Sequence, residues 1–175
     1  MIAQDQVKLN LKGLLLAFVM FVAAAVFAIG AIPNGDPLWF LPVFTEKPLR
    51  IMVYKQGCSA ELFEGEEGFD RVYLAVNQTV TQLEGLNDLH GLSADSPDQY
   101  RAKEKLVEVF YGRSITIHVP YRFGHPDSLF IPVTGYFADS RSIFGGQDGQ
   151  YWAGALRVKT LQPVADAIES IPCEK

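Results

Sequence analysis

The sequence has few of the residues from which catalytic and metal sites are most often built. Its 175 residues include two cysteines and three histidines, with no CxxC pair and no histidine at metal-ligand spacing from either cysteine. It has no GxSxG nucleophile motif, and no phosphate-loop lysine follows the glycine-rich stretch at 145–149, which predicts a hairpin loop instead. We therefore expect no catalytic residue, no bound metal and no cofactor, and hence a non-enzymatic role.

Positive charge is also scarce. The chain has 20 acidic and 15 basic residues, a formal net charge of −5, and no basic stripe, so nucleic acid is not expected as a partner. It has no internal repeat and no low-complexity tract. Hydrophobic residues make up 49% and charged residues 20%, which is typical of a globular domain with an apolar appendage.

One long apolar run is present near the N-terminus. Residues 13–32 read GLLLAFVMFVAAAVFAIGAI, without a charge or a proline, and about 20 such residues can cross a bilayer as a helix. Lys8 and Lys12 precede the run, whereas Asp36 is the nearest charge after it. The positive-inside rule therefore predicts a cytoplasmic tail at 1–12 and a single-pass protein of the plasma (inner) membrane with its domain outside.

A cleaved signal peptide is the alternative interpretation of this run. Small residues at 26–28 (VFA) and 28–30 (AIG) could fit a signal peptidase. The run is longer than the apolar region of a typical signal peptide, which favours the retained anchor. Residues 33–48 follow it with four prolines. They predict an interfacial linker, with Trp39 and Phe40 as anchors at the membrane surface.

The apolar run is also rich in small residues, which allow helices to approach closely in lipid. Ala24 and Ala28 lie one helical turn apart, with Ala17 and Ala31 close by. This face is the predicted contact with other membrane helices.

The remaining residues, 49–175, predict one α+β domain with a mostly antiparallel sheet, either open or partly closed into a barrel. A capped segment, SPDQYRAKEKLVEVFYG, predicts a helix over 96–111, and a weaker pattern predicts a second helix over 162–171. Alternating apolar residues predict strands at 49–54, 71–76, 114–123, 129–138 and 151–159. Loops are expected at 57–69, 84–95 and 139–149.

Two patterns leave alternatives open. Cys58 and Cys173 are either a disulfide or two unrelated thiols, and a domain outside the cytoplasm favours the disulfide. The three histidines, His90, His118 and His125, share no recurring ligand spacing, which favours surface roles over a metal site.

Three classes of function fit these features. The favoured hypothesis is an accessory or assembly subunit, with membrane lipid and other membrane protein subunits as its partners. The second is a membrane-tethered module that binds a ligand, cofactor or peptide, and the third is a tethered hydrolase. A deep pocket with convergent polar groups would favour the second, and a histidine beside a serine or cysteine would favour the third.

Overall fold

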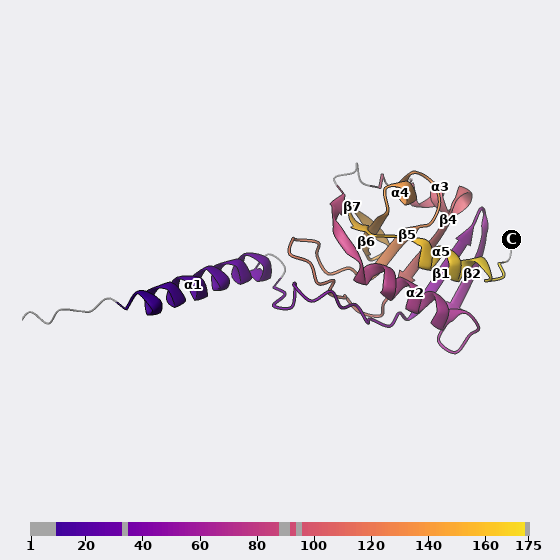
Figure 1. The fold of residues 1–175 in the computed structure, drawn as a ribbon. Coiled ribbons are helices and arrows are strands. Elements are labelled where there is room, and N and C mark those ends of the chain that lie inside the picture. Colours follow the sequence, from indigo (N-terminus) through magenta and orange to yellow (C-terminus); the bar gives the residue numbers. More distant parts are fainter. Residues whose placement is uncertain (1–9, 33–34, 88–91, 94–95, 174–175) are drawn as a thin grey trace, which may run out of the picture.

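An N-terminal helix precedes one α+β domain in this computed structural model, which describes residues 10–32, 35–87, 92–93 and 96–173 (Figure 1). Helix α1, Leu11–Ala31, begins after Asn10, whose side-chain oxygen accepts a hydrogen bond of 3.3 Å from the backbone N–H of Gly13. With 21 residues the helix is about 32 Å long. Its mean hydropathy of 2.7 makes it the one described helix long and apolar enough to cross a membrane.

A seven-stranded sheet forms the centre of the domain, with strand order β2-β1-β4-β5-β6-β7-β3 and antiparallel pairing throughout. The α+β class is therefore confirmed. The sheet does not close into a barrel, because β2 and β3 lie at its two edges. The strands are β1 Arg50–Lys55, β2 Cys58–Phe63, β3 Leu83–Asn87, β4 Lys105–Phe110, β5 Ser128–Pro132, β6 Ser142–Gln147 and β7 Gln150–Val158.

The sheet buries both of its faces. Helices α2, Phe69–Thr81, and α5, Gln162–Glu169, pack together over one face. Helices α3, Ser96–Lys103, and α4, Tyr136–Asp139, contact strands from the other. Because side chains alternate along a strand, each central strand contributes side chains to the hydrophobic cores on both faces of the sheet. The first core includes Val107, Val109, Leu129, Ile131 and Ile143, and the second includes Leu106, Phe130, Phe137, Phe144 and Ala155.

The predicted helix over 96–111 is wrong in its second half. Helix α3 ends at Lys103, and Lys105–Phe110 is strand β4, which lies between β1 and β5. A strand that is buried on both faces lacks a clean polar alternation, so KLVEVF also fits the apolar spacing of a helix. Hydrogen bonding to β1 on one side and to β5 on the other makes this segment a strand.

The predicted strand over 71–76 is also wrong, because these residues belong to helix α2. Over six residues the apolar positions alternate, but over the whole helix the buried side chains follow helical spacing. Buried Phe69, Val72, Val76 and Val80 are three or four residues apart, and Leu74 is 61% exposed.

Other predicted boundaries are corrected by the sheet. The loops expected at 57–69, 84–95 and 139–149 contain β2, part of β3 and β6 respectively. The strand expected at 129–138 ends at Pro132 and is followed by α4. Strands β1 and β7, helix α5 and the hairpin turn after Gln147 agree with the sequence patterns.

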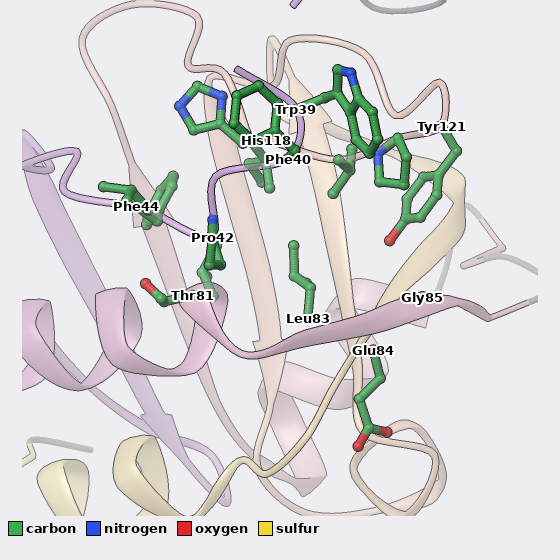
Figure 2. Close-up of a pocket in the computed structure, with 15 residues that line it drawn as sticks. Trp39, Phe40, Pro42, Phe44, Thr81, Leu83, Glu84, Gly85, His118 and Tyr121 are labelled. Atoms are coloured by element: carbon green, nitrogen blue, oxygen red, sulfur yellow. The ribbon is translucent and has the colours of Figure 1, made fainter. Parts of the chain in front are cut away.

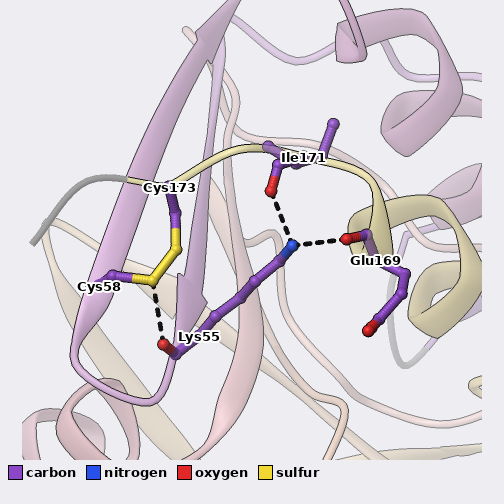
Figure 3. Close-up of a disulfide and its surroundings, with 5 residues drawn as sticks. All are labelled: Lys55, Cys58, Glu169, Ile171 and Cys173. Carbon is purple, nitrogen blue, oxygen red and sulfur yellow. Dashed lines mark hydrogen bonds between the residues drawn. A yellow bond between two sulfur atoms is a disulfide. The ribbon is translucent and has the colours of Figure 1, made fainter.

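The C-terminal segment is fastened to the β1–β2 hairpin (Figure 3). Cys58 and Cys173 form a disulfide with their α-carbons 5.7 Å apart, within the range that a bridge requires. Beside it, Lys55 Nζ donates hydrogen bonds to the carbonyl oxygens of Glu169 (2.9 Å) and Ile171 (2.7 Å). A cation that binds the last carbonyls of a helix stabilises that end. The end of α5 is therefore held by a covalent bond and by a charge.

Candidate functional site: the junction between helix α1 and the domain

The linker folds back against the end of helix α1. The indole of Trp39 packs on Gly30, and a side chain at Gly30 would overlap the ring. Trp39 Nε1 donates a hydrogen bond of 3.3 Å to the carbonyl oxygen of Phe27, and the ring of Phe40 lies edge-on to that of Phe27 at 6.3 Å. Gly30 is thus the small residue that lets the indole approach the helix backbone.

Asp36 connects this helix end to the domain. Its backbone N–H donates to the carbonyl of Ala31 (3.1 Å), and its Oδ1 accepts from the backbone N–H of Leu38 (2.9 Å). Its Oδ2 lies 2.8 Å from Nδ1 of His118. Asp36 is only 4% exposed, and a buried carboxylate without hydrogen bonds would be costly. These three contacts therefore fix the turn between the helix and the linker.

The segment that carries His118 is extended but is not part of the sheet. Residues 114–123 were predicted as a strand, and their burial does alternate, with Ile115, Ile117 and Val119 buried. No ladder with a neighbouring strand forms among the described residues, and Pro120 is exposed. The segment instead packs as an outer layer on the core shared with α2.

The rest of the linker is fastened along the domain. Phe44 is 5% exposed and meets the ring of Tyr111 edge-on at 6.2 Å. Glu46 forms an ion pair of 2.8 Å with Arg113. Burial, and then the neighbouring Glu46 carboxylate, raises the pKa of Tyr111. The described part of the segment predicted as an interfacial linker is therefore packed against the domain.

A groove of about 290 Å³ opens beside this junction (Figure 2). Linker residues form one wall, β3 and the end of α2 form another, and the extended segment forms the third. We call it the junction groove. Its lining consists of Trp39, Phe40, Pro42, Val43, Phe44, Val80, Thr81, Leu83, Glu84, Gly85, Ile117, His118, Val119, Pro120 and Tyr121.

A second cluster of polar residues lies on the opposite face of the sheet. Glu108 is 1% exposed and accepts hydrogen bonds from Arg101 Nε (3.1 Å) and Nη2 (2.6 Å), while Arg101 also pairs with Asp98 (2.6 Å). Partial burial acts to lower the pKa of Arg101, but the hydrogen bond and charge of Glu108 raise it. Burial and then the Glu108 carboxylate raise the pKa values of Tyr54 and Tyr151. The cluster keeps a charged pair inside the domain.

The described histidines and Ser93 have the following partners. His118 binds Asp36, and His125 Nδ1 lies 3.4 Å from the hydroxyl of Thr116. The hydroxyl of Ser93 lies 2.7 Å from another serine hydroxyl. No three metal-ligating side chains gather within residues 10–32, 35–87, 92–93 and 96–173, and His90 falls outside these ranges.

The predicted helix-contact residues lie on an accessible surface. Ala17 and Ala24 are exposed, and Ala28 and Ala31 are half-buried. They remain candidates for contact with other helices. Lys8, on which the predicted orientation partly rests, lies outside the described residues.

The two predicted interface anchors differ from each other. Phe40 is 53% exposed. Trp39 is partly buried against Gly30. The contact of Asp36 with His118 could not be found from the sequence, because 82 positions separate them. Asp36 did carry a signal, as the first acidic residue after a long apolar run.

Comparisons of this chain with protein family models, with curated proteins and with solved structures give no match.

Proposed function

We propose that this protein is a non-enzymatic accessory subunit of a membrane protein complex. Helix α1 anchors it in the plasma (inner) membrane, the tail before α1 is cytoplasmic and the α+β domain lies outside. The observation that carries the proposal is the folded junction. It joins α1 to the domain through the contact of Trp39 with Gly30 and the contact of Asp36 with His118. A partner that binds helix α1 therefore also positions the domain.

The surface of α1 supports the same proposal. Its large side chains are exposed along its length, including Leu15 (63%), Phe18 (63%) and Phe21 (71%). In lipid this exposure costs nothing, and association between helices there depends on close packing of small residues. The face of Ala24 and Ala28 offers such packing, beside an extracytoplasmic domain that is tied to the same helix.

The disulfide agrees with a domain outside the cytoplasm, because disulfides persist in oxidising compartments. The bridge joins the start of β2 to the segment after α5. It supports the proposed orientation independently of the charges around α1.

Co-purification from mild detergent tests the proposal. We expect a partner at constant stoichiometry, and we expect Ala24→Leu with Ala28→Leu to weaken its retention. The control is Val22→Leu with Val26→Leu, which enlarges two side chains on the opposite side of the helix, by one carbon each rather than three. A monodisperse monomer, or equal loss of the partner from both variants, would contradict the proposed contact face.

A further inference from the structure

The linker that follows helix α1 forms one wall of the junction groove (Figure 2). Trp39 lines the groove and at the same time packs on Gly30 in the last turn of α1. His118 lines it and binds Asp36, which follows the helix. If α1 crosses the bilayer, as the proposed function requires, the mouth of the groove therefore lies at the membrane surface.

An exposed apolar surface runs from α1 across the linker to this mouth. Leu38 is 46% exposed, Phe40 53%, Leu41 38% and Val43 53%, and two of them, Phe40 and Val43, line the groove. Contiguous apolar surface of this kind marks an interaction site. Because it continues the apolar surface of the spanning helix, the medium that covers it is lipid.

The groove selects hydrocarbon rather than a charged head group. Most of its lining is aliphatic, aromatic or proline. The carboxylate of Glu84 is engaged at the far side by Arg141 (3.1 Å) and lies 3.8 Å from Arg157, and His118 is engaged by Asp36. No lysine or arginine is among the groove's described lining residues, so an anionic head group gains nothing there.

We propose that the junction groove binds one acyl chain of a bilayer lipid. Its volume of about 290 Å³ corresponds to about ten groups of the size of a water molecule, which suits a portion of a single chain. Leu83 rises from β3 into the groove (Figure 2), and Val119 lies on the facing segment. A chain between them would fill the space between the edge strand and the linker.

The test is photolabelling of the full chain in phosphatidylcholine vesicles, with a diazirine at the middle of the lipid acyl chain. Bulk lipid reaches α1 and the exposed linker. We expect additional labelling of two groove-lining residues, Leu83 and Val119, of which Val119 is only 2% exposed. Leu83→Trp fills the groove and should lower the labelling of Val119 about tenfold. Leu86→Trp, on the same strand but outside the lining, should leave it unchanged.

The outcomes separate this inference from the proposed function. Labelling of α1 without labelling of Val119 in the wild-type protein overturns the lipid site and leaves the membrane anchor intact. Absence of labelling on α1 itself overturns the proposed anchoring and the lipid site with it. If Leu83→Trp does not fold, Val43→Asp places a charge at an exposed position of the mouth and should give the same loss. Labelling of Val119 that persists in a folded variant shows that the groove is not its source.

Discussion

The buried ion pair of Arg101 and Glu108 makes a quantitative prediction about the stability of the domain. Glu108 lies in the middle of the central strand β4 and is 1% exposed, while the Arg101 side chain is 30% exposed. Removing one partner of a buried pair leaves an uncompensated charge and typically costs about 3 to 5 kcal/mol. Because water reaches Arg101 but not Glu108, losing the arginine should be the more harmful of the two changes.

We expect Arg101→Met to lower the free energy of unfolding by about 3 kcal/mol, at the lower end of that range because the guanidinium is partly hydrated. Glu108→Leu should cost about 1 kcal/mol, since Arg101 keeps water and Asp98 at 2.6 Å. The double variant should lie within about 1 kcal/mol of wild type, because a buried pair can be replaced by apolar side chains of similar size. The coupling between the two positions is then about 3 kcal/mol.

Urea denaturation of the full chain in detergent, followed by near-UV circular dichroism, measures these free energies. Glu84→Ala with Arg141→Ala is a suitable control, because that ion pair is partly exposed and should contribute less than about 1 kcal/mol. If the double variant is as unstable as the sum of its single variants, the two side chains do not act as a pair and the reasoning is wrong.

Three further predictions concern the disulfide, the junction and the orientation. Replacing Cys58 and Cys173 by alanine opens a loop of 115 residues and should destabilise the domain by up to about 4.8 kcal/mol on chain-entropy grounds; equal denaturation midpoints for both proteins would refute this. Gly30→Leu should displace the indole of Trp39 and shift its side-chain N–H signal in NMR spectra, and an unchanged signal would show that the indole does not lie there. A reporter that works only outside the cytoplasm should be active when it is fused after Lys175. Activity of a reporter that works only in the cytoplasm would reverse the proposed orientation.

Features with local causes could be predicted from the sequence. The apolar run that forms α1 is continuous and uncharged from Gly13 onward. Strand β1 alternates along its first four residues, and the end of β7 has the alternating sequence Leu156, Arg157, Val158. The turn between β6 and β7 has a local signal too. Asp148 and Gly149 have φ values of 53° and 79°, the left-handed conformation that a two-residue hairpin of Asp-Gly type favours.

Features decided by tertiary pairing could not be predicted in this way. Strand β4 continues the apolar spacing of α3, and only its hydrogen bonding to β1 and β5 makes it a strand. The same holds for β3, whose Leu83–Asn87 sequence contains a glycine and no β-branched residue. Its pairing with the end of β7 overrides a weak local preference.

In the candidate site, too, some features have local causes and others depend on the tertiary fold. The apolar linker and its aromatic residues are visible in the sequence, but the fold alone brings His118 to Asp36 and Leu83 to the linker. Glu108, a glutamate in a mostly apolar strand, is a signal that the sequence-based prediction did not use. Such a residue requires a cationic partner, and Arg101 stands seven positions before it.

We infer that helix α1 and the domain form one unit through the folded junction. Nitroxide side chains introduced as unnatural amino acids at Leu16 on α1 and at Lys159, an exposed position in the domain, allow the distance between them to be measured by double electron–electron resonance in nanodiscs. We expect a single narrow distance distribution for the wild-type protein, which broadens when Asp36 and Trp39 are both replaced by alanine. A broad distribution in the wild-type protein, unchanged by these substitutions, would contradict it.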